Sequence, residues 1–360
     1  MIFPRFFSNK FGHSIVFNAM KRTLWLFVLI GLAGFHVPLS AAQTSAAVEY
    51  KKVAGTFVVE IARYDWSDTK RDRKVPVKIY YPKGPGPFPI IIFSHGLGGS
   101  REGYEYLGQH WASYGYVSVH LQHIGSDRAV WEGVQPAEIM QKMRDAAMNL
   151  DNAANRPKDV SFAIDQLEKM NREDSNFKGR LDLTRIGVGG HSFGAFTALA
   201  IAGQTFGGER GNVSFVDPRV KAVIAMSAPV TPNQARVESA FDRVKVPCFH
   251  MTGTRDSSPI GETRPEDRRI PFDRCHTSDQ YLVIFKDGDH MVFSGRGGMR
   301  GGEKDALYQS YIRVSSVAFW DAYLKEDAKA KKWLTGNGFQ ATLGSDGTFE
   351  KKLNLALNSP

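Results

Sequence analysis

The sequence predicts an α/β protein whose centre is one doubly wound, mainly parallel sheet. Short apolar runs alternate with segments of helical periodicity along most of the 360 residues, as in folds whose strands are joined by crossover helices. One run, PIIIFS at 89–94, is apolar throughout, which is typical of a central strand covered on both faces. Another, at 186–189, passes through a glycine-rich turn straight into the helix-forming segment 195–202.

The strands expected in chain order are residues 57–61, 75–81, 89–94, 117–121, 186–189, 220–226, 246–251 and 281–285, the first two joined by a polar turn at 65–73. The expected helices are residues 104–114, 137–154, 159–170, 195–202 and 308–324. Pro157 is expected to separate the second helix from the third, because proline lacks the N–H that a helix interior needs. Residues 326–360 are polar and predict no further element.

The stretch before the crossover helix at 159–170 is the least sheet-like part of the chain. The helix at 137–154 has an apolar face and follows Trp131. It predicts a helical insert at about 128–155 that caps the site described below, with Trp131 as a candidate substrate contact. Residues 43–360 are otherwise expected to form one domain.

The first 42 residues read as a secretory signal. Lys21 and Arg22 precede an apolar stretch within 23–39, which the small residues Ser40-Ala41-Ala42 follow. The apolar stretch is short for a membrane span. Met20 is an alternative start, because the signal is complete from there. The protein is therefore expected to be secreted or periplasmic, with no stable membrane span after cleavage; an uncleaved N-terminal anchor is the alternative.

The net charge of +9 does not indicate a nucleic-acid partner. Basic residues are spread along the chain and interleaved with acidic ones, as in 70–74 and 264–269, whereas nucleic-acid surfaces cluster them. A solvated basic surface is the favoured interpretation. The sequence carries no signal for the oligomeric state.

The two cysteines are expected to form a disulfide. Cys248 and Cys275 each precede or begin an apolar run, and neighbouring parallel strands start at the same edge of a sheet. An exported protein matures where disulfides persist. The alternative is a pair of buried, reduced thiols.

A glycine-flanked serine organises the chain. In GHSFG at 190–194, Ser192 sits at a sharp strand-to-helix turn, the anatomy of a nucleophile elbow. Gly190 and Gly194 would avoid collisions with the neighbouring strand and helix. Ser192 is therefore the candidate nucleophile.

A serine hydroxyl needs a base within hydrogen-bond reach, and the base needs an orienting acid. His290 and Asp256 each follow a predicted strand, so they belong at the same edge of the sheet as Ser192. Asp287 and Asp289 are rivals for the acid, and His123 is a rival for the base.

An oxyanion hole needs two backbone N–H groups aimed at one point. Phe193, directly after Ser192, would supply one and Leu97, in the loop HGLGG at 95–99, the other. His95 is expected to brace that loop rather than to react.

SHGLGG at 94–99, GHSFGA at 190–195, Asp256 and His290 together resemble the α/β-hydrolases related to platelet-activating factor acetylhydrolase, whose bacterial members are often labelled predicted dienelactone hydrolases. The resemblance covers roughly residues 50–325. It implies an α/β-hydrolase fold and a serine carboxylester hydrolase with Ser192, Asp256 and His290 as the triad and Leu97 and Phe193 as the hole. True dienelactone hydrolases carry cysteine at the elbow, where this chain has Ser192.

The leading hypothesis is an exported serine esterase that acts on small or lipid-like carboxylic esters through an acyl-enzyme, with no metal or cofactor. A phospholipase A2- or acetylhydrolase-type enzyme and a polyester hydrolase are alternatives within the same chemistry. An exported binding protein that kept the fold and lost turnover is the alternative of another class.

Overall fold

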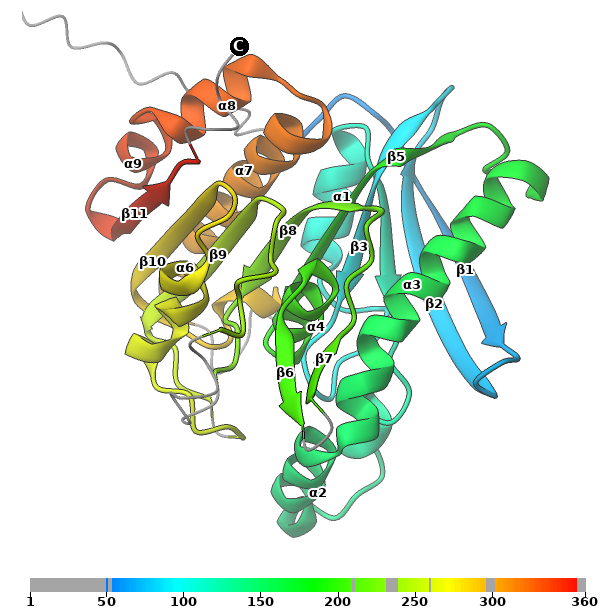
Figure 1. Ribbon diagram of the computed structural model, residues 1–360. Helices are drawn as coiled ribbons and strands as arrows, with labels where there is room; N and C mark the ends of the chain where they lie inside the picture. The colour runs from blue at the N-terminus through cyan, green and yellow to red at the C-terminus, as the bar shows by residue number, and fades with distance from the viewer. Residues whose placement is uncertain are drawn as a thin grey trace, which may run out of the picture. The chain divides into compact units, whose positions relative to one another are not determined.

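The computed structural model describes Tyr50 and residues 54–208, 211–230, 239–258, 260–295 and 302–354 (Figure 1). They belong to one compact unit, Ser45–Pro360. The predicted signal at 1–42, with Met20, lies outside the described residues and stays a prediction.

Within the described residues, nine strands form the central sheet in the order β1-β2-β4-β3-β5-β8-β9-β10-β11. The strands are β1 (Val59–Asp68), β2 (Arg73–Pro82), β3 (Phe88–Ser94), β4 (Val117–Leu121), β5 (Leu181–His191), β8 (Val220–Met226), β9 (Cys248–Arg255), β10 (Gln280–Asp289) and β11 (Gly347–Lys352). Pairing is parallel from β4 to β10 and antiparallel at both edges. The predicted α/β-hydrolase fold with a mainly parallel sheet is confirmed.

The order of the strands reverses at β3, which lies between β4 and β5 although both follow it in the chain. In open parallel sheets, ligands bind outside the carboxyl ends of the strands at such a switch point. The loop after β3 and the turn after β5 therefore meet where a site is expected.

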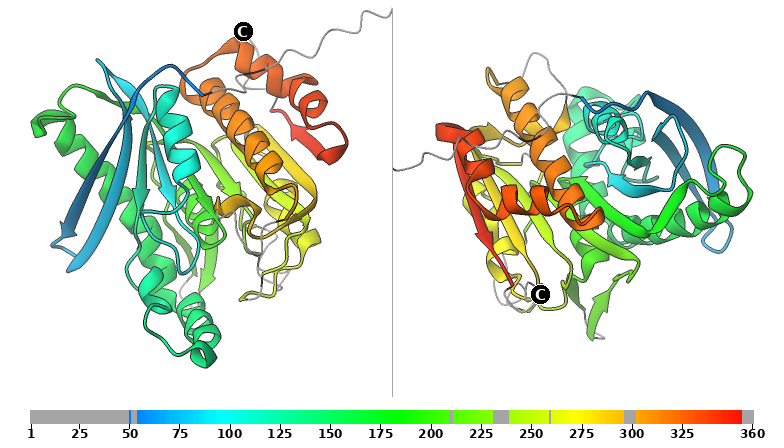
Figure 2. Two further views of the ribbon diagram at one scale, coloured as in Figure 1. Left: turned by 180° about the vertical axis from the view of Figure 1, so that it is seen from behind. Right: turned by 90° about the horizontal axis from the view of Figure 1, so that it is seen from above.

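Helices cover both faces of the sheet (Figure 2). On one face pack α3 (Leu150–Glu173) and α4 (Phe193–Ala202), and on the other α1 (Glu105–Ser113) and α7 (Asp305–Leu324). Strand β3 is buried along its whole length and alternates between the two cores: Ile90 and Ile92 face one, Ile91 and Phe93 the other. The run at 89–94 is therefore continuously apolar because both faces of β3 are covered, as the sequence predicted.

The predicted break at Pro157 is wrong. Helix α2 (Pro136–Met148) ends before Asn149, and α3 then runs unbroken through Pro157. Asn149 has extended φ and ψ, and its side chain accepts a hydrogen bond of 3.0 Å from the Asn152 N–H, so it caps the new helix. Burial of one face of α3 on both sides of Pro157 outweighs the lost backbone hydrogen bond.

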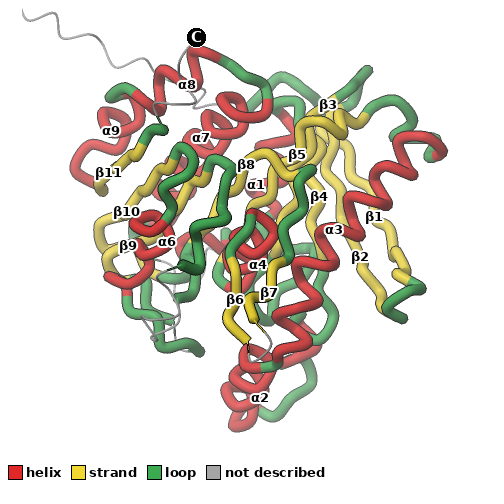
Figure 3. Tube along the Cα trace, in the orientation of Figure 1, coloured by secondary structure: helices red, strands yellow, loops and turns green. Residues whose placement is uncertain are grey.

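The predicted helical insert corresponds to the 3₁₀ turn η1 (Arg128–Val130) and α2. Helix α2 has no buried residue and lies at one end of α3 (Figure 3). The role of this insert as a cap stays a prediction.

Several described elements had no sequence prediction. After 325 the chain forms α8 (Ala328–Thr335), α9 (Gly338–Leu343), η4 (Gly344–Asp346) and β11, which pairs with the edge of β10. A hairpin of β6 (Thr205–Gly208) and β7 (Gly211–Ser214) follows α4, and η2 (Pro265–Arg269), α6 (Ile270–Arg274) and η3 (Val292–Ser294) lie near β9 and β10. The turn expected at 65–73 is shorter, at 69–72, because β1 and β2 form a long antiparallel pair.

The predicted disulfide is not formed: Cys248 and Cys275 are free thiols, both fully buried. They are neighbours, as the shared sheet edge suggested, and the Cys248 thiol donates to the Val246 carbonyl at 3.2 Å. Burial first, and then the contact with Cys275, raise the pKa of Cys248 well above its usual value. The two side chains pack in the apolar core as small hydrophobic groups.

Across the described helices, none has the combination of length and hydropathy that crossing a membrane would require.

Candidate active site

Ser192 sits on a strained turn between β5 and α4. Its φ of 56° and ψ of −118° lie outside the usual regions for a residue with a side chain. A Cβ on Gly190 would lie 2.2 Å from the Gly194 carbonyl oxygen, and one on Gly194 would lie 1.8 Å from the Ser94 carbonyl oxygen. Glycine at 190 therefore lets the strand turn tightly into α4, and glycine at 194 lets α4 approach β3.

The structure brings Ser192, His290 and Asp256 into one hydrogen-bonded row. Nε2 of His290 lies 3.0 Å from Ser192 Oγ, and Nδ1 lies 2.8 Å from Asp256 Oδ1. The three residues directly follow β5, β10 and β9, all at the carboxyl edge of the sheet. Asp256 is completely buried, whereas the His290 side chain is 12% exposed. In this arrangement the imidazole can accept the serine proton while the carboxylate orients the ring.

Three side chains that the sequence analysis missed surround Asp256. Ser227 Oγ donates to Oδ1 at 2.8 Å, Thr252 Oγ1 donates to Oδ2 at 2.8 Å, and Arg268 Nε lies 2.9 Å from Oδ1. Burial raises the pKa of Asp256, but the hydrogen bond to His290 and the charge of Arg268 outweigh it and lower the pKa. The carboxyl group is therefore ionised at neutral pH.

Arg268 corrects the prediction that 264–269 is only a solvated basic surface. Its side chain is buried, and it also donates to the carbonyl oxygens of Ser227 and Ala228 at 2.9 and 3.0 Å. No sequence pattern separated it from the exposed Arg264 four residues earlier.

The rival residues lie elsewhere. Asp287 forms an exposed ion pair with Arg255 at 3.0 Å, and Asp289 accepts from the backbone N–H groups of Met291 and Val292. His123 is buried between Ser94 and Asp159. None of the three joins the row that contains Ser192.

The loop at 95–99 is braced as expected for His95. Its Nδ1 lies 2.6 Å from the Gly96 carbonyl, and its Nε2 accepts from the His123 N–H at 3.1 Å. Within the described part of the chain, the N–H groups of Leu97 and Phe193 have no hydrogen-bond acceptor. Both amides are thus available to a bound group.

A second polar chain joins this loop to the base. The Gly96 N–H donates to the Tyr104 hydroxyl at 3.3 Å, and this hydroxyl lies 2.8 Å from His191 Nδ1. His191 Nε2 lies 2.9 Å from the His290 carbonyl, which only accepts, so Nε2 carries the proton and Nδ1 accepts from Tyr104. Burial, and then the neighbouring His290, hold the pKa of His191 well below its usual value. The residue before the nucleophile is therefore a neutral link.

Trp131 also contacts the loop at 95–99. Its Nε1 donates to the Gly98 carbonyl at 2.7 Å. Its predicted role as a substrate contact is not tested by this geometry. Cavities of about 320 and 630 Å³ also exist, but none of Ser192, Asp256 and His290 lines either of them. No group of three His, Cys, Asp or Glu in the described ranges is placed to hold a metal ion.

Several buried histidines predict acid lability. Burial lowers the pKa of His120 to about 3, and that of His110, His123 and His250 to about 4, from 6.5. The unfolded chain therefore binds more protons than the folded one between about pH 4 and 6.5, so this stability is complete above pH 6.5 and is lost as the pH falls through that window.

Each such histidine contributes a slope of up to about 1.4 kcal/mol per pH unit to the free energy of unfolding. Urea denaturation from pH 5 to 7.5 measures the slope. His120→Gln is expected to reduce this slope by the contribution of one proton, up to about 1.4 kcal/mol per pH unit. A pH-independent stability, or an unchanged slope in the variant, contradicts the burial of neutral histidines.

The family profile described as platelet-activating factor acetylhydrolase, isoform II, matches residues 69–253. A platelet-activating factor acetylhydrolase of Cavia porcellus is 24% identical over 290 residues, which cover 72% of this chain and 63% of the relative. Cutinase est1 of Thermobifida alba is 25% identical, with 71% of this chain and 67% of the relative covered.

A putative phospholipase A2 of Schizosaccharomyces pombe is 28% identical, with 36% of this chain and 38% of the relative covered. The chain thus spans less than two thirds of the length of the Cavia porcellus and Schizosaccharomyces pombe proteins. The matched residues 69–253 include the loop at 95–99 and the elbow and make up about half of the chain. The chain therefore belongs to the platelet-activating factor acetylhydrolase, isoform II, family.

Proposed function

We propose that the protein is a carboxylic ester hydrolase that uses Ser192 as nucleophile, His290 as general base and acid, and Asp256 to orient the imidazole. The observation that carries this proposal is the hydrogen-bonded row from Ser192 Oγ through His290 to the buried Asp256, built on a strained turn. A structural serine would not require the conformational strain that this one bears.

The reaction has two halves. Ser192 Oγ attacks the ester carbonyl carbon while His290 Nε2 takes its proton, and the carbonyl oxygen becomes an oxyanion that the Leu97 and Phe193 N–H groups receive. The intermediate collapses when His290 returns the proton to the departing alkoxide, which leaves as the alcohol. A water then attacks the acyl-enzyme by the same proton route and releases the acid. Asp256 stays ionised and stabilises the imidazolium in both halves.

The substrates are small or lipid-like esters. Relatives named as acetylhydrolase, phospholipase A2 and cutinase all belong to ester-hydrolysing classes, which supports lipid ester hydrolysis rather than another use of the same site. The cutinase match over 71% of this chain favours polyester hydrolysis as the second candidate. The segment 1–42 supports a secreted or periplasmic location.

Hydrolysis of p-nitrophenyl esters from acetyl to dodecanoyl tests the proposal, with Ser192→Ala as the blank. We expect turnover that depends on Ser192. A maximum at acetyl to butyryl indicates a small acyl pocket, and a maximum at octanoyl or longer indicates a lipid substrate. The absence of Ser192-dependent turnover on every ester contradicts the proposal and favours an exported binding protein with a hydrolase fold.

A further inference from the structure

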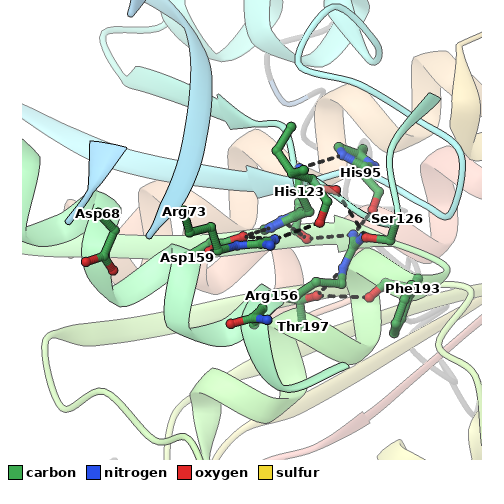
Figure 4. Close-up of polar contacts among 12 residues, drawn as sticks. Asp68, Arg73, His95, His123, Ser126, Arg156, Asp159, Phe193 and Thr197 are labelled. Carbon is green, nitrogen blue, oxygen red and sulfur yellow. Dashed lines mark hydrogen bonds and ion pairs between the residues drawn. The ribbon is translucent and has the colours of Figure 1, made fainter. Parts of the chain in front are cut away.

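Arg156 is a completely buried arginine on α3 that contacts Phe193 and Thr197 of α4 (Figure 4). Its Nη1 donates to Ser126 Oγ at 2.8 Å and its Nε donates to Thr197 Oγ1 at 3.0 Å. Its Nη2 donates to Ser94 Oγ at 3.1 Å and to the His95 carbonyl. One planar guanidinium thus joins the end of β3, the loop after β4 and helix α4.

The cation lacks a carboxylate partner of its own. Asp159, one turn further along α3, forms ion pairs with Arg71 and Arg73, both at 2.8 Å, and lies 2.9 Å from His123 Nδ1. No described carboxylate is within ion-pair distance of Arg156, although Asp159 acts on it through space. Burial lowers the pKa of Arg156 to about 9, so it is charged at neutral pH. A buried cation without a direct partner costs stability, and such a cost is typical of a functional site.

The Arg156 guanidinium contacts both parts of the proposed oxyanion hole, the loop that carries Leu97 and the start of α4 at Phe193. The His95 carbonyl that accepts from Arg156 begins the loop that carries Leu97, and Ser126 also accepts the Gly98 N–H through its carbonyl at 2.9 Å. On the other side, the guanidinium carbon lies 4.5 Å from the centre of the Phe193 ring. Figure 4 shows Arg156 between His95 and Ser126 on one side and Phe193 and Thr197 on the other.

We propose that Arg156 is a positioning residue that sets the separation of the Leu97 and Phe193 amides and so determines how well they receive the oxyanion. This inference rests on the proposed ester hydrolysis. Arg156 touches no substrate; it acts through the loop at 95–99 and the first turn of α4. Because a displacement of about 1 Å at reacting groups costs about 100-fold in rate, loss of the guanidinium should lower kcat and leave KM nearly unchanged.

Arg156→Lys tests the proposal, because lysine keeps the charge but replaces the rigid fork of five donors with a single ammonium. We expect kcat for p-nitrophenyl butyrate to fall about 100-fold, with KM within about threefold. A trifluoromethyl ketone, which forms an oxyanion on Ser192, should bind more weakly by the same factor as kcat. Arg71→Lys is the matched control: it changes the same network at Asp159 but contacts neither the loop nor α4.

Phe193→Leu keeps the backbone amide and removes only the ring that packs on the guanidinium, so it serves if Arg156→Lys fails to fold. We expect about a tenfold loss of kcat in this variant, again matched by the weaker ketone binding. If Arg156→Lys or Phe193→Leu folds and keeps the wild-type kcat and ketone affinity, the inference about Arg156 is wrong, and the proposed ester hydrolysis is unaffected. The inference is also wrong if Arg71→Lys loses as much kcat and ketone affinity as Arg156→Lys and these losses follow a fall in its melting temperature. A wild-type protein without Ser192-dependent hydrolysis overturns this inference together with the proposed function.

Discussion

Ser192→Ala and His290→Ala are each expected to lower kcat for ester hydrolysis by about 10⁶, and the double variant by no more than either single change. The two groups transfer one proton across a single 3.0 Å hydrogen bond. Without His290 the hydroxyl is not activated, and without Ser192 the imidazole has no proton to accept. Two residues that contributed independently would instead show multiplied losses.

Asp256→Asn is expected to lower kcat less, by about 10⁴, because an amide can hold the imidazole in the wrong tautomer but leaves nucleophile and base in place. Asp287→Asn is the control and should stay within about twofold, since its ion pair with Arg255 is exposed. Initial rates on p-nitrophenyl butyrate, with far-UV circular dichroism to verify folding, measure the series. A large loss of kcat in Asp287→Asn, or a near-normal kcat in Asp256→Asn, would show that the assignment of Asp256 as the acid is wrong.

Gly194→Ala is expected to destabilise the protein by about 3 kcal/mol or more and to abolish activity. Alanine in place of glycine ordinarily favours a helix by about 1 kcal/mol. Here the new Cβ would lie 1.8 Å from the Ser94 carbonyl oxygen, a backbone atom of β3 that cannot rotate away. This clash outweighs the gain in helix propensity. To avoid the clash α4 must move away from β3, and the Phe193 amide of the proposed oxyanion hole moves with it.

Urea denaturation measures this effect, with Gly261→Ala as the control. Among the described residues, no heavy atom lies within 4 Å of a Cβ at Gly261, so that change should alter the free energy of unfolding by less than about 0.5 kcal/mol. If Gly194→Ala unfolds at the wild-type urea concentration and keeps its activity, the close approach of α4 to β3 is incorrect.

Sequence alone was enough to identify the residues at the centre of the proposed site. The elbow at 190–194 is a local pattern, because the glycines that permit the turn and the serine that bears its strain lie within five residues. Asp256 and His290 could be selected because each follows an apolar strand, and parallel strands end at one edge of the sheet. The same periodicity predicted β3, β4 and β8 to within about one residue at either end.

Only the tertiary structure revealed the groups that hold this row in place. Arg268 looked like one more basic surface residue, and Arg156 lay in a polar stretch next to a proline that appeared to end its helix. Their partners are up to 62 residues away in the chain, so no local pattern records them. Burial of one face of α3 outweighs the effect of Pro157, Cys248 and Cys275 are buried as free thiols, and β11 pairs with the edge of β10 although the sequence after 325 is polar. Local patterns select the residues of the proposed reaction, whereas long-range packing decides what orients them, because burial changes the free energy of each contact more than local propensity does.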